Sequence, residues 1–350
     1  MNEATGMERV AMEREGVAKM GYERPMEYGR LMPRMRNNRE KLPWSQEIWN
    51  RIDQAVHKEC QRTKVARQFL PLYGPVAAGQ TTVHSDTVVI NGNVINGNGQ
   101  SLSVDETATT PLVEILADFI LTAQQVDREE ELMTAVTLAT RAANLIAQAE
   151  DVLIFQGQTA VEAGTEQHPL FKDGKVRLLS GNAGTGLLGG LPTNQVIEVP
   201  PIVAKPLRFG EKTFEAVAAA YSRLQSGDEL EQAHYGPYAL VLQFVEYADS
   251  YAPVLTNQAA LANTLAITAD RIKPLVTAGF YGTGTVPALT GLLVSLGGNT
   301  MDLVVGMDVT TSFLQEDPDG RYRLRVWERF ALRRKDSSAI IRLKFLDQVP

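Results

Sequence analysis

The chain has 350 residues, with 34 Lys and Arg against 41 Asp and Glu, which gives a formal net charge of −7. Hydrophobic residues make up 44% and charged residues 21%, a composition that excludes a wholly disordered chain and a collagen-like repeat. The sequence therefore predicts a folded protein with one large or two small domains, and the acidic balance argues against a dedicated nucleic-acid binder.

The single cysteine, Cys60, excludes an intrachain disulfide and a cysteine-based zinc cluster, and it fits a reducing compartment. The N-terminus carries charges throughout, so we do not expect a secretory signal. The most apolar stretch, 286–297, contains Pro287 and falls short of the ~20 apolar residues that a membrane helix needs. We therefore expect no membrane partner.

Residues 1–41 are predicted to form an N-terminal arm and not a domain of their own. Seven of the ten methionines lie here. The arm ends in a basic stretch made up of Arg30, Arg34, Arg36, Arg39 and Lys41. It has too few large apolar residues to fold alone, so a disordered tail is one alternative. Flexible thioethers fit irregular grooves, which favours an arm that docks on a neighbouring subunit.

A clear helix is predicted to begin after Ser45, which can cap its first turn, and to run to about Phe69. Its apolar face repeats at helical spacing and consists of Ile48, Trp49, Ile52, Val56 and Cys60.

Residues 76–104 have no helical period and are rich in Thr, Val, Asn and Gly. The pentapeptide Val-Ile-Asn-Gly-Asn occurs twice in tandem, at 89–93 and 94–98. Asn-Gly pairs favour two-residue turns, so we predict a long protruding β-hairpin. Two strands alone are marginally stable in water, and another subunit is one surface on which the hairpin could lie.

The strongest helical pattern covers Asp127–Glu150, with a start at Asp127 and Glu130 that resembles a capping box. A short apolar strand is predicted at Val152–Phe155, ended by Gly157. Later in the chain we predict helices over 214–224 and 259–272 and strands over 196–203, 238–242, 303–309, 321–332 and 339–345.

No motif in the sequence indicates catalysis, so we expect no enzyme and assign no catalytic, cofactor-binding or metal-binding residue. Gly184–Gly189 matches G-x-G-x-x-G, but an extended segment follows it where a dinucleotide site needs a helix, so a flexible loop is predicted. His57 and Cys60 share a helix face, yet the three other histidines are distant in sequence, which favours core or interface residues over a metal site.

Arg321, Arg323 and Arg325 alternate with apolar residues and give one C-terminal strand a basic face. A half-buried strand with a solvated face is one interpretation. The others are salt bridges between subunits or an inner surface that faces something acidic such as DNA.

Four groups of segments occur in order along the chain: Leu42–Asp53 with Gly74–Thr81, Ala149–Gly157, Gly236–Leu242, and Met301–Asp308 with Glu328–Arg334 and Ile340–Leu343. Together they resemble the encapsulin family, the shell proteins of bacterial nanocompartments that share the tailed-phage capsid fold of the Hong Kong 97 type. The resemblance covers roughly residues 42–345.

This resemblance implies an α+β Hong Kong 97-like capsid fold with an N-terminal arm, an extended β-hairpin loop, a peripheral domain with a long spine helix, and an axial domain. The implied boundaries are 1–41 for the arm, 42–75 for the N-terminal helix segment, 76–126 for the extended loop, 127–209 for the peripheral domain, 210–300 for the axial domain and 301–350 for the return strands of the peripheral domain.

The function implied is that of a structural shell protein. Many copies self-assemble into an icosahedral hollow particle, which encloses a cargo protein in the cytoplasm. The alternative is the major capsid protein of a tailed bacteriophage, whose virion encloses double-stranded DNA together with other capsid proteins. The extra arm and the longer hairpin also suit this alternative.

The resemblance also implies candidate sites. The family's pore loop corresponds to Tyr251, Ala252, Pro253, Val254, Leu255, Thr256, Asn257 and Gln258. Cargo is expected to dock near the helix that begins after Ser45, with candidate residues Ile48, Trp49, Ile52 and Val56. Some family members stack a flavin on an aromatic residue after the extended loop, but no aromatic residue occurs between Phe119 and Phe155, so no cofactor is expected.

Overall fold

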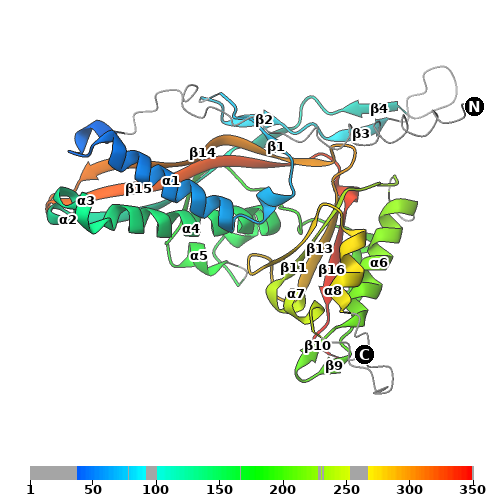
Figure 1. Ribbon diagram of the computed structural model, residues 1–350. Helices are drawn as coiled ribbons and strands as arrows, with labels where there is room; N and C mark the ends of the chain where they lie inside the picture. Colours follow the sequence, from blue (N-terminus) through cyan, green and yellow to red (C-terminus); the bar gives the residue numbers. More distant parts are fainter. Residues whose placement is uncertain are drawn as a thin grey trace, which may run out of the picture. The chain divides into compact units, whose positions relative to one another are not determined.

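Two long strands, β14 (Met301–Glu316) and β15 (Arg321–Arg334), form an antiparallel ribbon at the centre of the first sheet (Figure 1). β6 (Val113–Thr122) continues the sheet beside β15, followed by β7 (Arg177–Ser180), and β1 (Leu72–Tyr73) runs parallel to β14 at the other edge. The computed structural model describes residues 38–77, 79–91, 101–165, 167–227, 230, 232–252 and 267–348. All of these belong to one compact unit.

Two helices, α1 (Gln46–Thr63) and α4 (Thr134–Gln156), pack against each other and against the first sheet (Figure 1). The predicted cap of α1 is confirmed, because the Ser45 side chain accepts a hydrogen bond from the backbone N–H of Ile48. The apolar face of α1 and most of α4 lie in one hydrophobic core with the inward side chains of the sheet. Exposed positions of α1 are polar, so this helix is amphipathic.

The long helix α4 begins later than predicted. Residues before it form the short helices α2 (Ala123–Asp127) and α3 (Glu129–Leu132), and Met133 interrupts the helical run with a positive φ of 50°. The buried Glu129 carboxylate accepts hydrogen bonds from the first backbone N–H groups of α4, at 2.8 Å and 3.2 Å. The predicted cap at Asp127 and Glu130 is therefore wrong, because Glu129 satisfies these donors instead.

The predicted strand at Val152–Phe155 is also wrong, since these residues are the last turn of α4. All four side chains are completely buried. A helix that is covered on all sides shows no polar face, so its apolar run looks the same as a buried strand. The helix ends at Gln156, later than the predicted end at Glu150, and it is followed by Gly157, which was predicted to end the strand and adopts a φ of 72°.

The first helix ends at Thr63, earlier than the predicted Phe69. Lys64 is extended, and a separate 3-10 turn follows at Ala66–Gln68. The Asp151 carboxylate of α4 accepts hydrogen bonds from the backbone N–H groups of Val65 and Ala66, at 2.8 Å and 3.0 Å. This side chain therefore takes donors that a continuous helix would have bonded internally.

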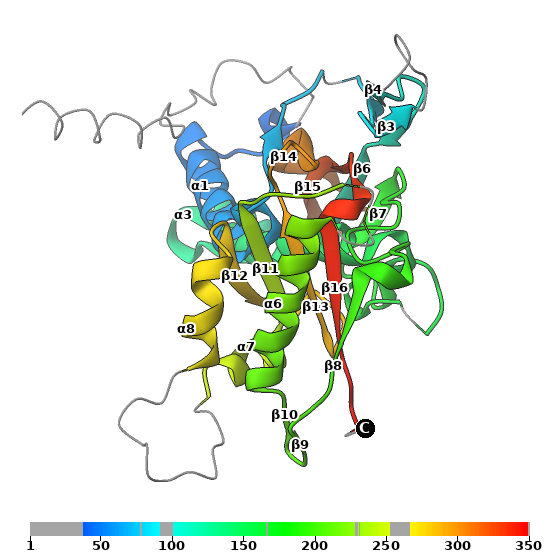
Figure 2. The same cartoon turned by 90° about the vertical axis from the view of Figure 1, so that its right-hand side faces the viewer.

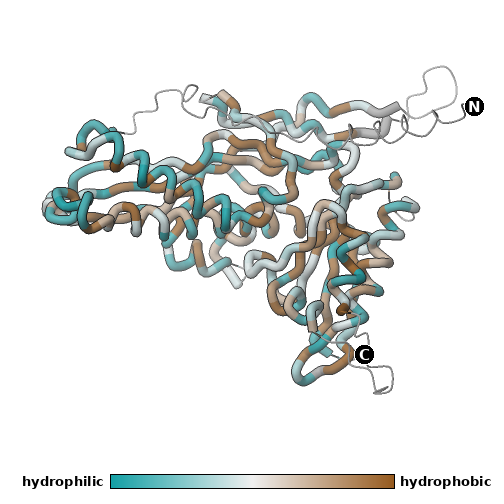
Figure 3. The backbone as a smooth tube through the Cα atoms, in the orientation of Figure 1, coloured by the Kyte–Doolittle hydropathy of each residue, from teal (hydrophilic) through white to brown (hydrophobic). Residues whose placement is uncertain are grey.

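A second sheet has the strand order β12-β11-β13-β16-β8, and α6 (Glu211–Ser226) lies across it (Figure 2). Its strands are β12 (Gly279–Thr283), β11 (Tyr238–Gln243), β13 (Thr290–Ser295), β16 (Ile340–Phe345) and β8 (Val196–Val199). Alternate side chains of these strands join either a core beneath α6 or the core of the first sheet. Figure 3 shows that these strands are mainly hydrophobic, as a sheet covered on both faces requires.

Two predictions about strand placement have different outcomes. β8 lies at the edge of its sheet, as predicted from Pro200 and Pro201. β16, predicted among the return strands of the peripheral domain, instead pairs with β13 and β8 in the second sheet. The domain boundaries themselves stay a prediction.

The predicted hairpin is confirmed in the described residues. β2 (Thr82–His84) pairs with β5 (Thr109–Pro111), and β3 (Val88–Asn91) pairs with β4 (Ser101–Val104), both antiparallel. The Asn-Gly turns predicted within 92–100 lie outside the described residues, as do the arm at 1–37 and the part of the predicted helix at 259–266.

The remaining short elements are α5 (Pro169–Lys172), α7 (Phe244–Ser250), α8 (Thr268–Ile272), β9 (Val203–Ala204) and β10 (Leu207–Arg208). Within the described ranges, no helix has the length and apolar character to cross a membrane.

Candidate functional site

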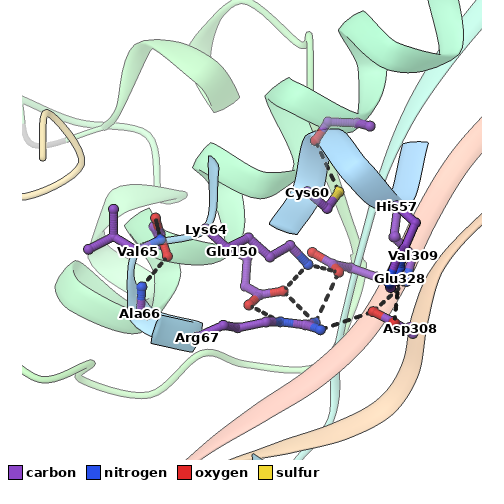
Figure 4. Close-up of polar contacts among 12 residues, drawn as sticks. His57, Cys60, Lys64, Val65, Ala66, Arg67, Glu150, Asp308, Val309 and Glu328 are labelled. Atoms are coloured by element: carbon purple, nitrogen blue, oxygen red, sulfur yellow. Dashed lines mark hydrogen bonds and ion pairs between the residues drawn. The ribbon is translucent and has the colours of Figure 1, made fainter. Parts of the chain in front are cut away.

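A cluster of buried charges lies where the end of α1 meets α4 and β15 (Figure 4). The Lys64 Nζ donates to Glu150 Oε2 at 2.6 Å and also to Glu328 Oε2. The Arg67 guanidinium donates to both Glu150 oxygens, at 2.7 Å and 2.8 Å, and to Glu328 at 3.3 Å. Its Nη1 reaches Asp308 Oδ1 on β14 at 2.9 Å. We call these five residues the buried charge cluster.

Burial makes these contacts obligatory. Lys64 is 2% exposed, and Glu150 and Glu328 are fully buried. An ionised group loses several kcal/mol of hydration in such a place, which only close partners with good geometry can offset. The cluster therefore fixes α1 to the spine-like helix α4 and to both strands of the central ribbon.

The cluster is electrostatically asymmetric. Burial and the Glu150 carboxylate raise the pKa of Glu328 to about 8, although Lys64 and Arg67 oppose this shift. Burial also acts to raise the pKa of Glu150, but the attraction of Arg67 and Lys64 outweighs it and holds that pKa well below its ordinary value. Glu328 is therefore the carboxyl of the pair that takes up a proton near neutral pH.

The neighbouring Cys60 and His57 do not converge on a metal site. The Cys60 thiol is buried and donates to the Ala143 carbonyl at 3.5 Å, and burial raises its pKa to about 12. His57 instead approaches Asp308, with 3.8 Å between Nδ1 and Oδ2 (Figure 4). Across the described segments, no group of three His, Cys, Asp or Glu side chains could hold a metal ion. The cluster therefore connects structural elements and offers no reactive thiol.

The four side chains predicted to dock cargo, Ile48, Trp49, Ile52 and Val56, are all buried against α4 and the first sheet. They cannot contact a second molecule without unfolding this core, so choosing them as docking residues is wrong. The physical reason is that the apolar face of an amphipathic helix is the face that packs inward. The region around α1 as the place of docking stays a prediction.

The predicted pore loop is described only at Tyr251 and Ala252, because 253–258 lie outside the described residues. Tyr251 stacks on Phe280 with ring centroids 6.2 Å apart, and its hydroxyl lies 3.2 Å from that of Tyr247. The Lys273 ammonium lies 5.1 Å from the Tyr251 ring. These contacts anchor the start of the segment, and its role as a pore loop stays a prediction.

Each arginine of the predicted basic face has a carboxylate partner within the chain. Arg321 pairs with Asp319. Arg323 pairs with Asp317 at 2.9 Å, and Arg325 with Asp118 at 2.8 Å. Asp118 also pairs with Arg177 on β7, so this carboxylate is shared between two arginines. The predicted role of the face as an inner or interface surface stays a prediction.

The hairpin is tied to the first sheet at its base and carries apolar side chains farther out. Arg333 on β15 donates to Asp86 and, at 3.2 Å, to the His84 carbonyl. Val88 and Val104 face each other across β3 and β4 and are 39% and 49% exposed. Such a pair leaves apolar surface for a contact with another molecule.

The chain is similar in sequence and in fold to known shell proteins. The family model described as "Encapsulating protein for peroxidase" matches residues 35–166 and 181–331, which together include α1, α4 and most of both sheets. The chain belongs to this encapsulin family. The segments Ala149–Gly157, Met301–Asp308 and Glu328–Arg334, quoted above for the resemblance, supply the three carboxylates of the buried charge cluster.

Two curated relatives are encapsulin shell proteins. The chain is 29% identical over 316 residues to the type 1 encapsulin shell protein EncA of Myxococcus xanthus (strain DK1622), covering 86% of this chain and 94% of that protein. It is 23% identical over 306 residues to the diheme-cytochrome-encapsulin shell fusion protein of Kuenenia stuttgartiensis, covering 86% of this chain and 73% of that one.

Solved structures show the same fold. The virus-like particle of Pyrococcus furiosus has a TM-score of 0.58 and 14% identity, covering 85% of this chain and all of that chain. The capsid of Myoviridae phage XM1 has a TM-score of 0.50 and 11% identity, covering 81% and 92%. The predicted Hong Kong 97-like α+β capsid fold is thus confirmed. This encapsulin is a structural shell protein that assembles from many copies of itself.

Proposed function

We propose that this encapsulin forms an icosahedral nanocompartment in the cytoplasm and encloses a cargo protein. The observation that carries the proposal is the encapsulin family match across both sheets of the fold. Closed shells form when heterologous contacts repeat with rotations that close. The projecting hairpin with its exposed Val88 and Val104 supplies one surface for such contacts.

The charges of the chain favour a protein content over double-stranded DNA. A surface that binds DNA releases counterions by placing uncompensated Lys and Arg against phosphates. Here each arginine of the basic face of β15 is paired with a carboxylate, Asp319, Asp317 or Asp118, the last of which also binds Arg177. The net charge of −7 adds repulsion.

For the docking position we infer a surface beside the start of α1. The Trp44 indole donates to the Val126 carbonyl of α2 at 2.9 Å, which places the entry of α1 against the α2–α3 segment. That segment ends in Leu132 and Met133, which are 45% and 43% exposed. An apolar anchor of a cargo segment would bury these two side chains.

The content of native particles tests the proposal. Mass spectrometry of particles purified from their native cells should find a stoichiometric second protein, and a nuclease-protection assay should find no packaged genome. Abundant nuclease-resistant double-stranded DNA would instead identify a phage capsid.

The docking surface has its own test. Leu132→Ser should lower cargo occupancy several-fold while particle yield stays the same, because about 1.5–3 kcal/mol of apolar burial is lost per anchoring side chain. Leu179→Ser on β7 removes another exposed leucine, 58% exposed, and should leave occupancy unchanged. Equal cargo occupancy in wild-type, Leu132→Ser and Leu179→Ser particles would refute docking at this position.

A further inference from the structure

The base of the hairpin, the G-x-G-x-x-G loop and β15 line an open-sided cavity of about 360 Å³. This volume lies within the range of small-molecule sites in proteins. Its polar lining consists of Ser85, Thr87, Thr109, Thr110, Asn182, Thr185 and Arg334. Its apolar wall includes Leu153 and Phe330, which are buried.

Arg334 is the ionisable residue among the described residues that line this cavity. Its Nη1 donates to the carbonyls of Gly186 and Gly189, at 2.9 Å and 2.8 Å, and no described carboxylate pairs with it. The adjacent Arg333 has the opposite environment, because Asp302 binds it with two oxygens and Asp86 with a third. Arg333 is thus neutralised by carboxylates, whereas Arg334, which lines the cavity, has no described carboxylate partner.

The electrostatic state of Arg334 agrees with this geometry. Burial lowers the pKa of Arg334, whereas the carboxylates around Arg333 overcome its burial and raise that pKa. A half-buried cation without a counter-charge is destabilised, and an anion placed beside it would remove that penalty.

The glycine loop holds Thr185 at the rim of the cavity. Gly184 and Gly186 have positive φ values of 62° and 65°. A Cβ on Gly186 would lie 2.5 Å from the backbone nitrogen of Gly157 at the end of α4, so only glycine allows this close approach. The motif therefore has a packing reason, and it also brings a hydroxyl to the cavity that Arg334 faces.

Hydroxyl groups complete a donor set suited to an oxyanion. Ser85 Oγ and Thr110 Oγ1 lie 2.8 Å apart across the hairpin base, and each hydroxyl can rotate to donate toward the cavity. Carboxylates, which would repel an anion, are missing from the described lining. We propose that this cavity binds a small molecule through an oxyanion, a phosphate or carboxylate group, with Arg334 as the residue that binds this group and the apolar wall facing the rest of the ligand.

The test uses assembled particles of the full chain and isothermal titration calorimetry. The probes are inorganic phosphate, phenyl phosphate, acetate and benzoate, each against chloride at matched ionic strength. We expect saturable binding of at least one aromatic probe, and the comparison of phosphate with carboxylate probes identifies the preferred group. Arg334→Gln should weaken this binding at least about tenfold, since it removes the charge but keeps a donor for the loop carbonyls.

Arg325→Gln is the matched control, because it removes a cation from the same strand but outside the cavity, and it should leave the affinity unchanged. Ala183→Leu, at a half-buried loop position that lines the cavity, should weaken binding with Arg334 intact. If Arg334→Gln does not fold, the affinity of the Ala183→Leu variant tests the proposal. Absence of saturable binding by all four probes, or equal affinity in the wild type and both cavity variants, would overturn the proposal.

Discussion

Lys64 lies between two fully buried carboxyl groups, Glu150 and Glu328, and its removal would leave the Glu150 charge without this partner and Glu328 without a hydrogen-bond donor. Breaking a buried ion pair by deleting one member costs about 3–5 kcal/mol of unfolding free energy. We expect Lys64→Met to destabilise the subunit by this amount, measured by chemical denaturation. The control Arg62→Met, which removes an exposed cation from its ion pair with Glu59, should destabilise the subunit much less. Similar losses in both variants would contradict a structural role for the cluster.

Glu328 makes stability depend on pH in a definite direction. Its ordinary pKa is 4.5 and its folded pKa is about 8, so between these values the folded state holds a proton that the unfolded state has released. Stability therefore falls as pH rises through this window. We therefore expect the melting temperature of the wild type to fall as the pH is raised from 5 to 9.

Glu328→Gln removes this titration while preserving the shape of the neutral acid. The variant should show a flatter dependence of melting temperature on pH, especially above pH 7. The remaining slope below pH 7 is expected from Asp151, because burial raises its pKa to about 7 and so acts in the same direction. An unchanged slope above pH 7 would show that Glu328 does not carry the effect.

The two fully buried acids of this cluster, Glu150 and Glu328, were not predicted from the sequence, although both leave a signal in it. Glu150 follows Ile146 by four positions on the apolar face of its helix, and Glu328 occupies the inward position between Val326 and Phe330. A charge at an inward position predicts a buried partner. The partner itself could not be predicted, because Lys64 is far from both acids in sequence and is brought to them only by the tertiary packing of α1 on α4.

At the scale of elements, the sequence predicts features that depend on interactions between residues close together in the chain. The Ser45 cap and the buried strand β11 follow from the sequence. The start of α4 does not, because a carboxylate from the preceding turn, Glu129, caps it across a residue in the left-handed conformation. Such caps depend on how the chain folds back, which periodicity does not encode.

The hairpin gives a prediction at this scale. Val88→Ser with Val104→Ser should leave the subunit folded, because both side chains are exposed in it. If the pair is buried against a neighbouring subunit, the change removes about 1.5–3 kcal/mol per side chain from every such contact. Particle assembly should then require a higher protein concentration, measured by size-exclusion chromatography. Thr82→Ser on the same hairpin is the control, and assembly equal to wild type in both would exclude the hairpin pair from the contact.

At the scale of the whole molecule, the resemblance read from the sequence predicted the capsid fold and the shell function. The resemblance did not predict which strand pairs with residues 340–345. A local sequence pattern indicates that a segment is a strand, but it does not specify which distant strand is its partner. The choice of cargo-docking residues was wrong for a related reason. An apolar helix face indicates that something packs against it, but it does not indicate whether the packing partner belongs to the same chain.

The N-terminal arm can be tested in the assembled particle. Deleting residues 1–37 should leave a folded subunit, because the core of the described unit begins at Leu42. Weak contacts repeated over many copies add up through multivalency, so loss of the arm should lower the melting temperature of the shell or change its diameter. Particles of identical diameter and melting temperature would show that the arm does not bind neighbouring subunits.

Because Cys60 is buried, we expect the intact shell to react poorly with thiol-labelling reagents. The chain has one cysteine, and its thiol is buried with a pKa of about 12, so almost no thiolate is present at neutral pH. Native particles should take up no maleimide, whereas unfolded protein should take up one per chain. A cysteine introduced at any exposed position would then be the sole reactive group. Thiol reagents too bulky to pass through the shell would label only the introduced cysteines that face outward. Introduced cysteines that these reagents leave unlabelled would face the interior.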